Sequence, residues 1–288
     1  MKRYFSFLIL FLVTAGLSSC LKDEAVLDPS GSKNIIEFYN VTAPTSGVTA
    51  PYVMYVPTTL EVVPEVEFDI AISYSGAELE APQDIVVNLA EAPEAVTAFN
   101  ASQGTSYVQM GASGYEFPSS VTIRKGEKRV YAKVKVRPTI LNQAVSNVLA
   151  LTITSASFGE ISGNFRTVIF SLPIKSIWEG TYTYTVTNNF GTIDGNIGGV
   201  FTEQNVRLST VGPNRLYMQY LWRTYSGYSE YQFNADNTDI TSVLAFSGSV
   251  LSSSIEEVIL IDTENLIFEI RWVGLGRGVI ERFVRTGD

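Results

Sequence analysis

Beyond its first residues, the chain alternates hydrophobic and polar residues in short runs separated by Gly, Pro, Asn and Ser. A period of two predicts β-strands, because successive side chains of a strand point to opposite faces of a sheet. In the first half we expect strands at 34–41, 66–74, 84–90, 119–124, 129–137, 148–155 and 167–174. About seven strands with regularly spaced turns are typical of an immunoglobulin-like β-sandwich, which we place at residues 34–175.

Two local features refine this first domain. Lys125-Gly126-Glu127-Lys128 separates two strand-like runs and predicts a hairpin turn between 121–124 and 129–136. Residues 93–100 begin with Pro93 and carry the apolar Val96 and Phe99, a pattern that favours a short helix.

The second half predicts a β-meander. Its strand-like runs are 180–187, 198–202, 205–211, 216–224, 228–234, 243–246, 255–261, 266–273 and 279–285. Consecutive hairpins of this kind predict an up-and-down sheet that closes or nearly closes into a barrel, here at residues 177–288. All three tryptophans, Trp178, Trp222 and Trp272, lie in this region, and we expect Trp178 and Trp272 in its core or at the barrel ends because both alternate with apolar residues. The expected fold class is therefore all-β.

The N-terminus predicts secretion. Lys2 and Arg3 precede an apolar stretch at 4–16, which is shorter than the ~20 residues that a transmembrane helix needs. The length suits a signal peptide at 1–19. Leu17-Ser18-Ser19-Cys20 has the form of a lipobox, so we expect acylation of Cys20 and membrane anchoring through that lipid. Residues 20–33 are polar and turn-rich, and form the expected lipidated tether.

Several motifs together resemble a known family. Ala98-Phe99-Asn100, Gly104-Thr105-Ser106-Tyr107, Tyr115 and the 121–126 segment resemble the immunoglobulin-like N-terminal domain of Bacteroidetes surface lipoproteins of unknown function. One departure is Met110-Gly111, near the place where that family often has Leu-Pro. The opening Trp178-Glu179-Gly180-Thr181-Tyr182 is similar to the lipocalin-like domains that often follow.

The resemblance implies a cellular role as well as a fold. Such proteins commonly accompany glycan-uptake machinery, which implies glycan capture beside an outer-membrane transporter complex. Leu21-Lys22-Asp23-Glu24 resembles the signal that sends Bacteroidetes lipoproteins to the outer face of the outer membrane. A charged tether is also compatible with any lipoprotein, so the face of the membrane stays open at this point.

Composition excludes several functions. The chain has a net charge of −9, and loss of Lys2 and Arg3 with the signal peptide makes it more negative, which disfavours nucleic-acid partners. It has no histidine and a single cysteine, which excludes Ser-His-Asp and Cys-His catalysis and His-based zinc sites. No carboxylate pair lies in a recognisable motif. We therefore expect no enzymatic activity, cofactor or metal.

Two loops invite alternative interpretations. Asp236-Asn237-Thr238-Asp239 offers oxygen ligands of the kind that bind calcium, but the same residues favour an ordinary turn. Gly274-Leu275-Gly276-Arg277-Gly278 superficially resembles a phosphate loop, although it lies between two predicted strands and lacks a following helix. We expect a turn at both places.

An aromatic hairpin at 216–234 is the strongest candidate site. A two-residue turn at Ser226-Gly227 would place Tyr225 opposite Tyr228 and Arg223 opposite Glu230. Alternation then gives a dry face of Met218, Tyr220, Trp222, Tyr231 and Phe233. It gives a solvent face that includes Tyr217, Gln219, Arg223, Tyr225, Tyr228 and Glu230.

That solvent face has the composition of a sugar-binding surface. Sugar rings present apolar C–H faces and hydroxyls, and they bind flat aromatic rings flanked by amide and charged groups. We therefore expect Tyr217, Gln219, Arg223, Tyr225, Tyr228 and Glu230 to bind ligand. Tyrosines also occur on hairpins for their strand propensity alone, which is the competing interpretation.

Three functions compete at this point. The leading hypothesis is a non-enzymatic carbohydrate-binding lipoprotein. A fimbrial or adhesive subunit is the second, although the first arginine after Cys20 is Arg124, inside the predicted sandwich, and such assembly often needs cleavage at an earlier arginine. A lipocalin-like carrier of a small ligand is the third; it needs a hollow barrel.

Overall fold

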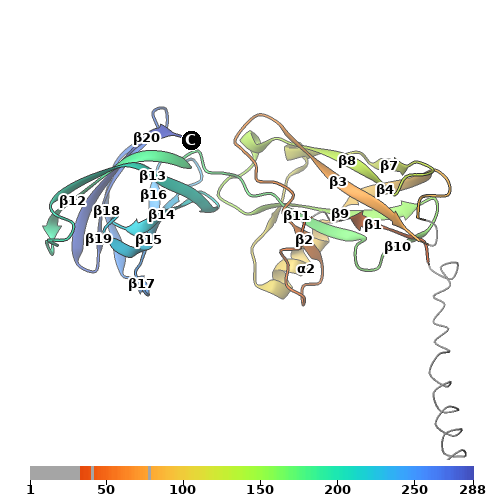
Figure 1. Cartoon of the computed structure of the whole chain (residues 1–288), viewed down its shortest axis with the longest axis horizontal. Helices are drawn as coiled ribbons and strands as arrows, with labels where there is room; N and C mark the ends of the chain where they lie inside the picture. The colour runs from red at the N-terminus through yellow and green to blue at the C-terminus, as the bar shows by residue number, and fades with distance from the viewer. Residues whose placement is uncertain (1–32, 40–41, 77–78) are drawn as a thin grey trace, which may run out of the picture.

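The protein folds into two β domains joined by a short linker (Figure 1). The computed structural model describes residues 33–39, 42–76 and 79–288. The expected signal peptide and Cys20 lie outside the described residues. Within the described part of the chain, no helix combines the length and the apolar character needed to cross a bilayer.

The first domain is a sandwich of two sheets. One has the order β10 (Glu160–Ile161), β1 (Ile35–Tyr39), β3 (Val66–Ser75), β8 (Arg129–Val136) and β6 (Tyr115–Glu116). The other has the order β2 (Val53–Tyr55), β11 (Thr167–Ser171), β9 (Asn147–Ala156), β4 (Ile85–Glu91) and β7 (Ser120–Ile123), with β5 (Val108–Gln109) also paired to β9. Buried alternate positions such as Ile72, Val134 and Leu151 fill the space between them, as the period of two predicted.

The predicted hairpin at 125–128 is wrong. β7 pairs with β4 in one sheet, whereas β8 pairs with β3 and β6 in the other. The turn is held by a distant segment: the Gly126 amide donates to the Ala81 carbonyl over 2.9 Å, and the Lys125 amide donates to Asp84 Oδ1 over 2.8 Å. These bonds direct the chain from one sheet to the other.

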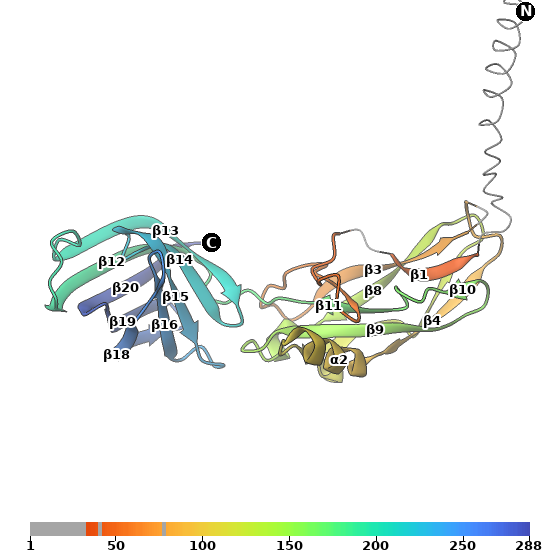
Figure 2. The same ribbon diagram turned by 90° about the horizontal axis from the view of Figure 1, so that it is seen from below.

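The predicted helix is present as α2 (Pro93–Gln103), and two short 3₁₀ helices, η2 (Ala112–Gly114) and η3 (Pro138–Ile140), follow in the chain. Pro93 occupies the first turn of α2, and Gly104 ends it in the left-handed region at φ 65°. Its apolar face, which includes Val96 and Phe99, packs on β9 and β11 (Figure 2).

The second domain is a single curled sheet of nine strands. Their order is β17 (Val250–Leu251), β16 (Ile240–Phe246), β15 (Tyr225–Phe233), β14 (Arg215–Leu221), β13 (Val200–Gly212), β12 (Gly180–Gly191), β20 (Arg277–Gly287), β19 (Ile267–Gly274) and β18 (Ser253–Asp262). The two ends of the sheet approach each other, where Ser253 Oγ donates to the Val243 carbonyl over 2.6 Å. Figure 2 shows this curl, which confirms the expected meander.

Two of the predicted strands are in fact one. The runs 198–202 and 205–211 form the single strand β13, interrupted by a bulge at Asn205, whose φ is 60°. An Asn in the left-handed region supplies the extra residue of a bulge, so a break in the alternation does not end the strand.

Aromatic side chains fill the inside of the curled sheet. Trp178 stacks on Phe233 with ring centroids 5.1 Å apart, and Phe268 stacks on Phe283 at 4.3 Å. Trp178 and Trp272 are fully buried, as the sequence predicted. One carboxylate lies among them, that of the fully buried Glu281.

Candidate functional site

The aromatic hairpin exists, but its turn lies earlier than predicted. Residues 222–224 connect β14 to β15, and Leu221 pairs with Tyr225. The turn is closed by the Arg223 amide donating to the Tyr220 carbonyl over 3.2 Å. Tyr220, Trp222 and Arg223 have φ values of 68°, 51° and 55°, conformations that the sequence gives no reason to expect.

Because the turn is shifted, one residue of the predicted dry face lies on the surface. Trp222 and Tyr231 are buried in the core, as predicted, but Tyr220 is 44% exposed. Gly227 lies inside β15 instead of in a turn, at a point where a Cβ atom would be 1.9 Å from the Phe246 carbonyl oxygen. The glycine is therefore required by close strand approach, which mimics a turn signal in the sequence.

Four of the six predicted site residues share the outer face of the sheet. Tyr217 pairs with Glu230, and Gln219 pairs with Tyr228. The Tyr217 and Tyr228 ring centroids are 5.2 Å apart. The structure adds a ring that sequence reasoning missed: Phe246 of β16 stacks on Tyr228 at 4.9 Å and 11°. We call Tyr217, Gln219, Tyr228, Glu230 and Phe246 the outer aromatic surface.

Charge on this surface comes from a residue other than the predicted one. Arg215 Nε lies 3.4 Å from Glu230 Oε2. Arg223, predicted opposite Glu230, instead forms a bidentate pair with Glu203 of β13, with N–O distances of 2.9 and 2.6 Å. The hydrogen bonds of this pair lower the pKa of Glu203 and raise the pKa of Arg223. Arg223 is thus engaged within the protein.

Tyr225 is likewise not part of the outer aromatic surface. Its hydroxyl donates to Asp194 Oδ2 over 2.6 Å, and Arg277 pairs with the same carboxylate. Hydrogen bonds from Tyr225 and from the Asn196 amide, together with Arg277, lower the pKa of Asp194 to about 2. These residues tie the 192–199 loop to the 222–224 and 275–276 turns at one end of the curled sheet.

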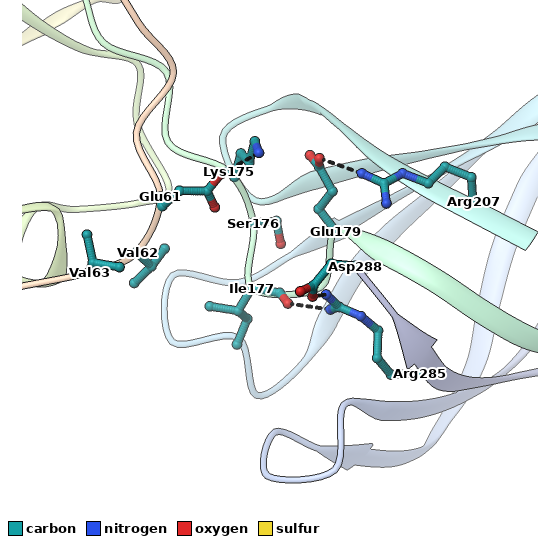
Figure 3. Close-up of a pocket in the computed structure, with 10 residues that line it drawn as sticks. All are labelled: Glu61, Val62, Val63, Lys175, Ser176, Ile177, Glu179, Arg207, Arg285 and Asp288. Carbon is teal, nitrogen blue, oxygen red and sulfur yellow. Dashed lines mark hydrogen bonds and ion pairs between the residues drawn. The ribbon is translucent and has the colours of Figure 1, made fainter. Parts of the chain in front are cut away.

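Charged residues gather in a cleft of about 430 Å³ between the domains (Figure 3). Lys175 pairs with Glu61. Arg207 Nη2 lies 2.9 Å from Glu179 Oε1, while Arg285 contacts the Asp288 carboxylate and the Ile177 carbonyl. Each charge in this cleft has a partner within the protein, so its lining presents little uncompensated charge to a ligand.

The two glycine- and Asx-rich loops are turns, as predicted. The Asn234 side-chain oxygen accepts the Thr238 amide over 2.9 Å. Residues 275–276 connect β19 to β20. Among the described residues, no three His, Cys, Asp or Glu side chains gather as a metal site.

Comparison with known proteins finds one family model that matches part of the chain and several solved structures of low sequence identity. A family model described as an N-terminal domain matches residues 45–159, within the sandwich. The first domain is similar to that family. No curated protein matches the chain.

Solved structures from Bacteroides are similar over most of the chain. A protein of unknown function from Bacteroides ovatus is 15% identical, with 87% of this chain and 93% of that chain covered and a TM-score of 0.44. A multidomain protein from the same organism is 14% identical, with 87% and 92% covered and a TM-score of 0.43. An auxiliary nutrient binding protein from Bacteroides thetaiotaomicron is 14% identical, with 77% and 82% covered and a TM-score of 0.37. The family-model match at residues 45–159 agrees with the expectation of a family-type N-terminal domain in the sandwich.

Proposed function

We propose that this protein is a non-catalytic carbohydrate-binding lipoprotein. Acyl chains on Cys20 anchor it to the outer membrane, with both domains outside the cell, where it serves a glycan-uptake complex. The lipobox and the resemblance support the location, and the outer aromatic surface supports the ligand class.

The observation that carries the proposal is the run of rings on the outer face of β14, β15 and β16. Tyr217, Tyr228 and Phe246 form a row across the three strands. The ring centroids of Tyr217 and Tyr228 are 5.2 Å apart, and those of Tyr228 and Phe246 are 4.9 Å apart. Gln219 is exposed beside them, and the Arg215–Glu230 pair borders the same face. Apolar rings next to amide, carboxylate and guanidinium groups match the apolar faces and hydroxyls of a sugar.

The packing of the second domain argues against a small-ligand carrier. The centre of the curled sheet is occupied by rings in mutual contact, such as Tyr231 and Phe283 at 5.3 Å and Trp222 and Trp272 at 5.6 Å. A carrier needs this space for its ligand. Ligand binding on the outside of the sheet needs no such space.

Isothermal titration of the mature protein against neutral plant, host and microbial glycans tests the proposal. We expect heat of binding with at least one of them. Absence of binding to every glycan, at protein concentrations that detect millimolar dissociation constants, would contradict the proposed function.

A double substitution locates the site. Tyr217→Ala with Tyr228→Ala should weaken binding about tenfold or more, which corresponds to ~1.4 kcal/mol, because both stacking rings are lost. Tyr131→Ala is the matched control, since Tyr131 is a 54% exposed tyrosine on β8 of the first domain. If the control weakens binding as much as the double substitution, the outer aromatic surface is not the site.

A further inference from the structure

The linker between the domains has a second cleft, different in character from the charged one of Figure 3. It has a volume of about 490 Å³, within the range of roughly 300–1,000 Å³ that small-molecule sites occupy. Both domains line it. The polar groups of the first domain are those of Thr59, Tyr107, Gln143, Ser146, Asn147 and Ser171, and the second domain contributes residues 209–213.

Several of these polar groups have no partner in the protein. Gln143 Oε1 is buried and accepts no hydrogen bond among the described residues. The hydroxyls of Tyr107, Ser171 and Ser209 also line the cleft, and within the described part of the chain they form no hydrogen bond. Buried polar groups are normally paired, so the unpaired Gln143 oxygen and the free hydroxyls beside it suit a ligand that supplies the missing partners.

The charges at the edge of this cleft are already compensated. Lys175 pairs with Glu61, and Glu179 accepts a hydrogen bond from the Thr210 amide over 3.0 Å besides its ion pair with Arg207. The remaining lining is uncharged. An ionic ligand would find no free counter-charge here, whereas an uncharged polyhydroxyl compound matches the available groups.

The cleft is continuous with the outer aromatic surface. Ser209 of β13, which lines the cleft, is the cross-strand partner of Tyr217 on β14. Cross-strand partners of an antiparallel pair present their side chains on the same face, with strands about 4.8 Å apart. From Phe246 through Tyr228 and Tyr217 to Ser209, one continuous track therefore leads across the second domain to the first.

We infer that this cleft holds one end of an extended, uncharged oligosaccharide whose next units lie on Tyr217 and Tyr228. The inference rests on the proposed function and adds the ligand's form: a chain of several units, bound by both domains at once. A short sugar would reach the rings or the cleft but not both.

Chain-length series of neutral oligosaccharides test this inference. Cello-, xylo-, manno- and malto-oligosaccharides, from disaccharide to heptasaccharide, are titrated into the mature two-domain protein. For the series that binds, we expect affinity to rise at least fivefold with length and then to level off. Bound ligand should also slow hydrogen exchange of the amides at 143–147 and 209–212.

Substitutions on the first domain separate the two parts of the track. Gln143→Ala with Ser146→Ala should remove the gain for the long ligand and leave the affinity for the short one unchanged. Ser119→Ala with Ser120→Ala, both exposed and outside the cleft lining, is the matched control. Equal thermal midpoints of the variants and the wild type verify that folding is intact.

The outcomes distinguish the inference from the proposed function. Binding that does not depend on chain length, or a cleft variant that binds the long ligand as the wild type does, overturns the inference alone. Failure of every series and every glycan to bind overturns both.

Discussion

At the scale of single residues, Glu281 is the most unusual side chain of the second domain. It is fully buried, and its carboxylate accepts hydrogen bonds from Tyr184 Oη at 2.5 Å, Tyr231 Oη at 2.8 Å and Trp272 Nε1 at 2.6 Å. Burial raises the pKa of Glu281 above its ordinary value, while these three donors act in the opposite direction. The carboxylate thus orients three large rings of the core.

This pKa gives a prediction for stability against pH. The folded state binds the Glu281 proton more tightly than the unfolded state does. Protonation of Glu281 therefore stabilises the fold fully below about pH 4.5, and this stabilisation is lost as the pH rises through the raised pKa. Glu281→Gln cannot titrate. The difference in unfolding free energy between wild type and variant should therefore fall as pH increases from 4.5, in urea titrations at a series of pH values. Parallel curves would contradict the assignment.

Removal of the carboxylate tests its hydrogen bonds. Glu281→Ala leaves three buried donors without their acceptor, and each unpaired group costs roughly 1–3 kcal/mol. We expect the second domain to lose about 3 kcal/mol or more in urea denaturation, and Glu281→Gln to lose less because its amide oxygen still accepts. Equal losses for the two variants would show that shape, and not hydrogen bonding, is what Glu281 contributes.

At the scale of elements, the pairing of β15 with β16 places Tyr228 against Phe246. Gly227 makes this possible, since its φ of 121° and its contact with the Phe246 carbonyl leave no room for a side chain. The sequence Ser226-Gly227 therefore marks a close approach of two strands.

Gly227→Ala should be strongly destabilising. A residue at such a φ costs roughly 1–3 kcal/mol, and the clash with backbone adds to it. Gly248→Ala is the control, because Gly248 has a φ of 75° but no atom within 4 Å of an added Cβ, so only about 1–2 kcal/mol of backbone strain applies. Thermal denaturation of both variants measures the difference; comparable losses would contradict the close approach.

At the scale of the whole molecule, the linker brings together groups from both domains. The Ser176 amide donates to Thr210 Oγ1 over 2.9 Å, and Ile174 forms a bridge with Leu60 of the first domain. Both clefts flank this segment, one with paired charges and the other with unpaired hydroxyls. The relative position of the domains therefore decides what the neutral cleft can bind.

The anchor proposed at Cys20 makes a prediction for the intact cell. Acyl chains contribute ~0.8 kcal/mol per buried methylene, so the native protein should partition into the detergent phase of a phase-separating extraction. Cys20→Ser removes the acylated atom and should move the protein to the aqueous phase. Native protein found in the aqueous phase, or a native mass that still includes residues 1–19, would contradict the anchor.

Much of the fold can be predicted from the amino-acid sequence. Alternation alone predicted β3, β8, β12 and β19 to within a few residues, because a period of two is a local property. Pro93 similarly marked the start of α2, although the helix runs to Gln103 and so extends beyond the predicted end at residue 100. For the candidate site, the local pattern placed Tyr217, Gln219, Tyr228 and Glu230 on the outer face, but it misplaced Tyr225 and Arg223.

What the sequence by itself determined is therefore the β class, the order of strands in the meander and the burial of Trp178 and Trp272. Only the tertiary structure decided that β7 and β8 lie in opposite sheets, that Phe246 completes the outer aromatic surface, and that Gln143 and Ser209 face one cleft. The reason is that these outcomes depend on backbone bonds and left-handed conformations stabilised by residues distant in the chain, which no local pattern encodes.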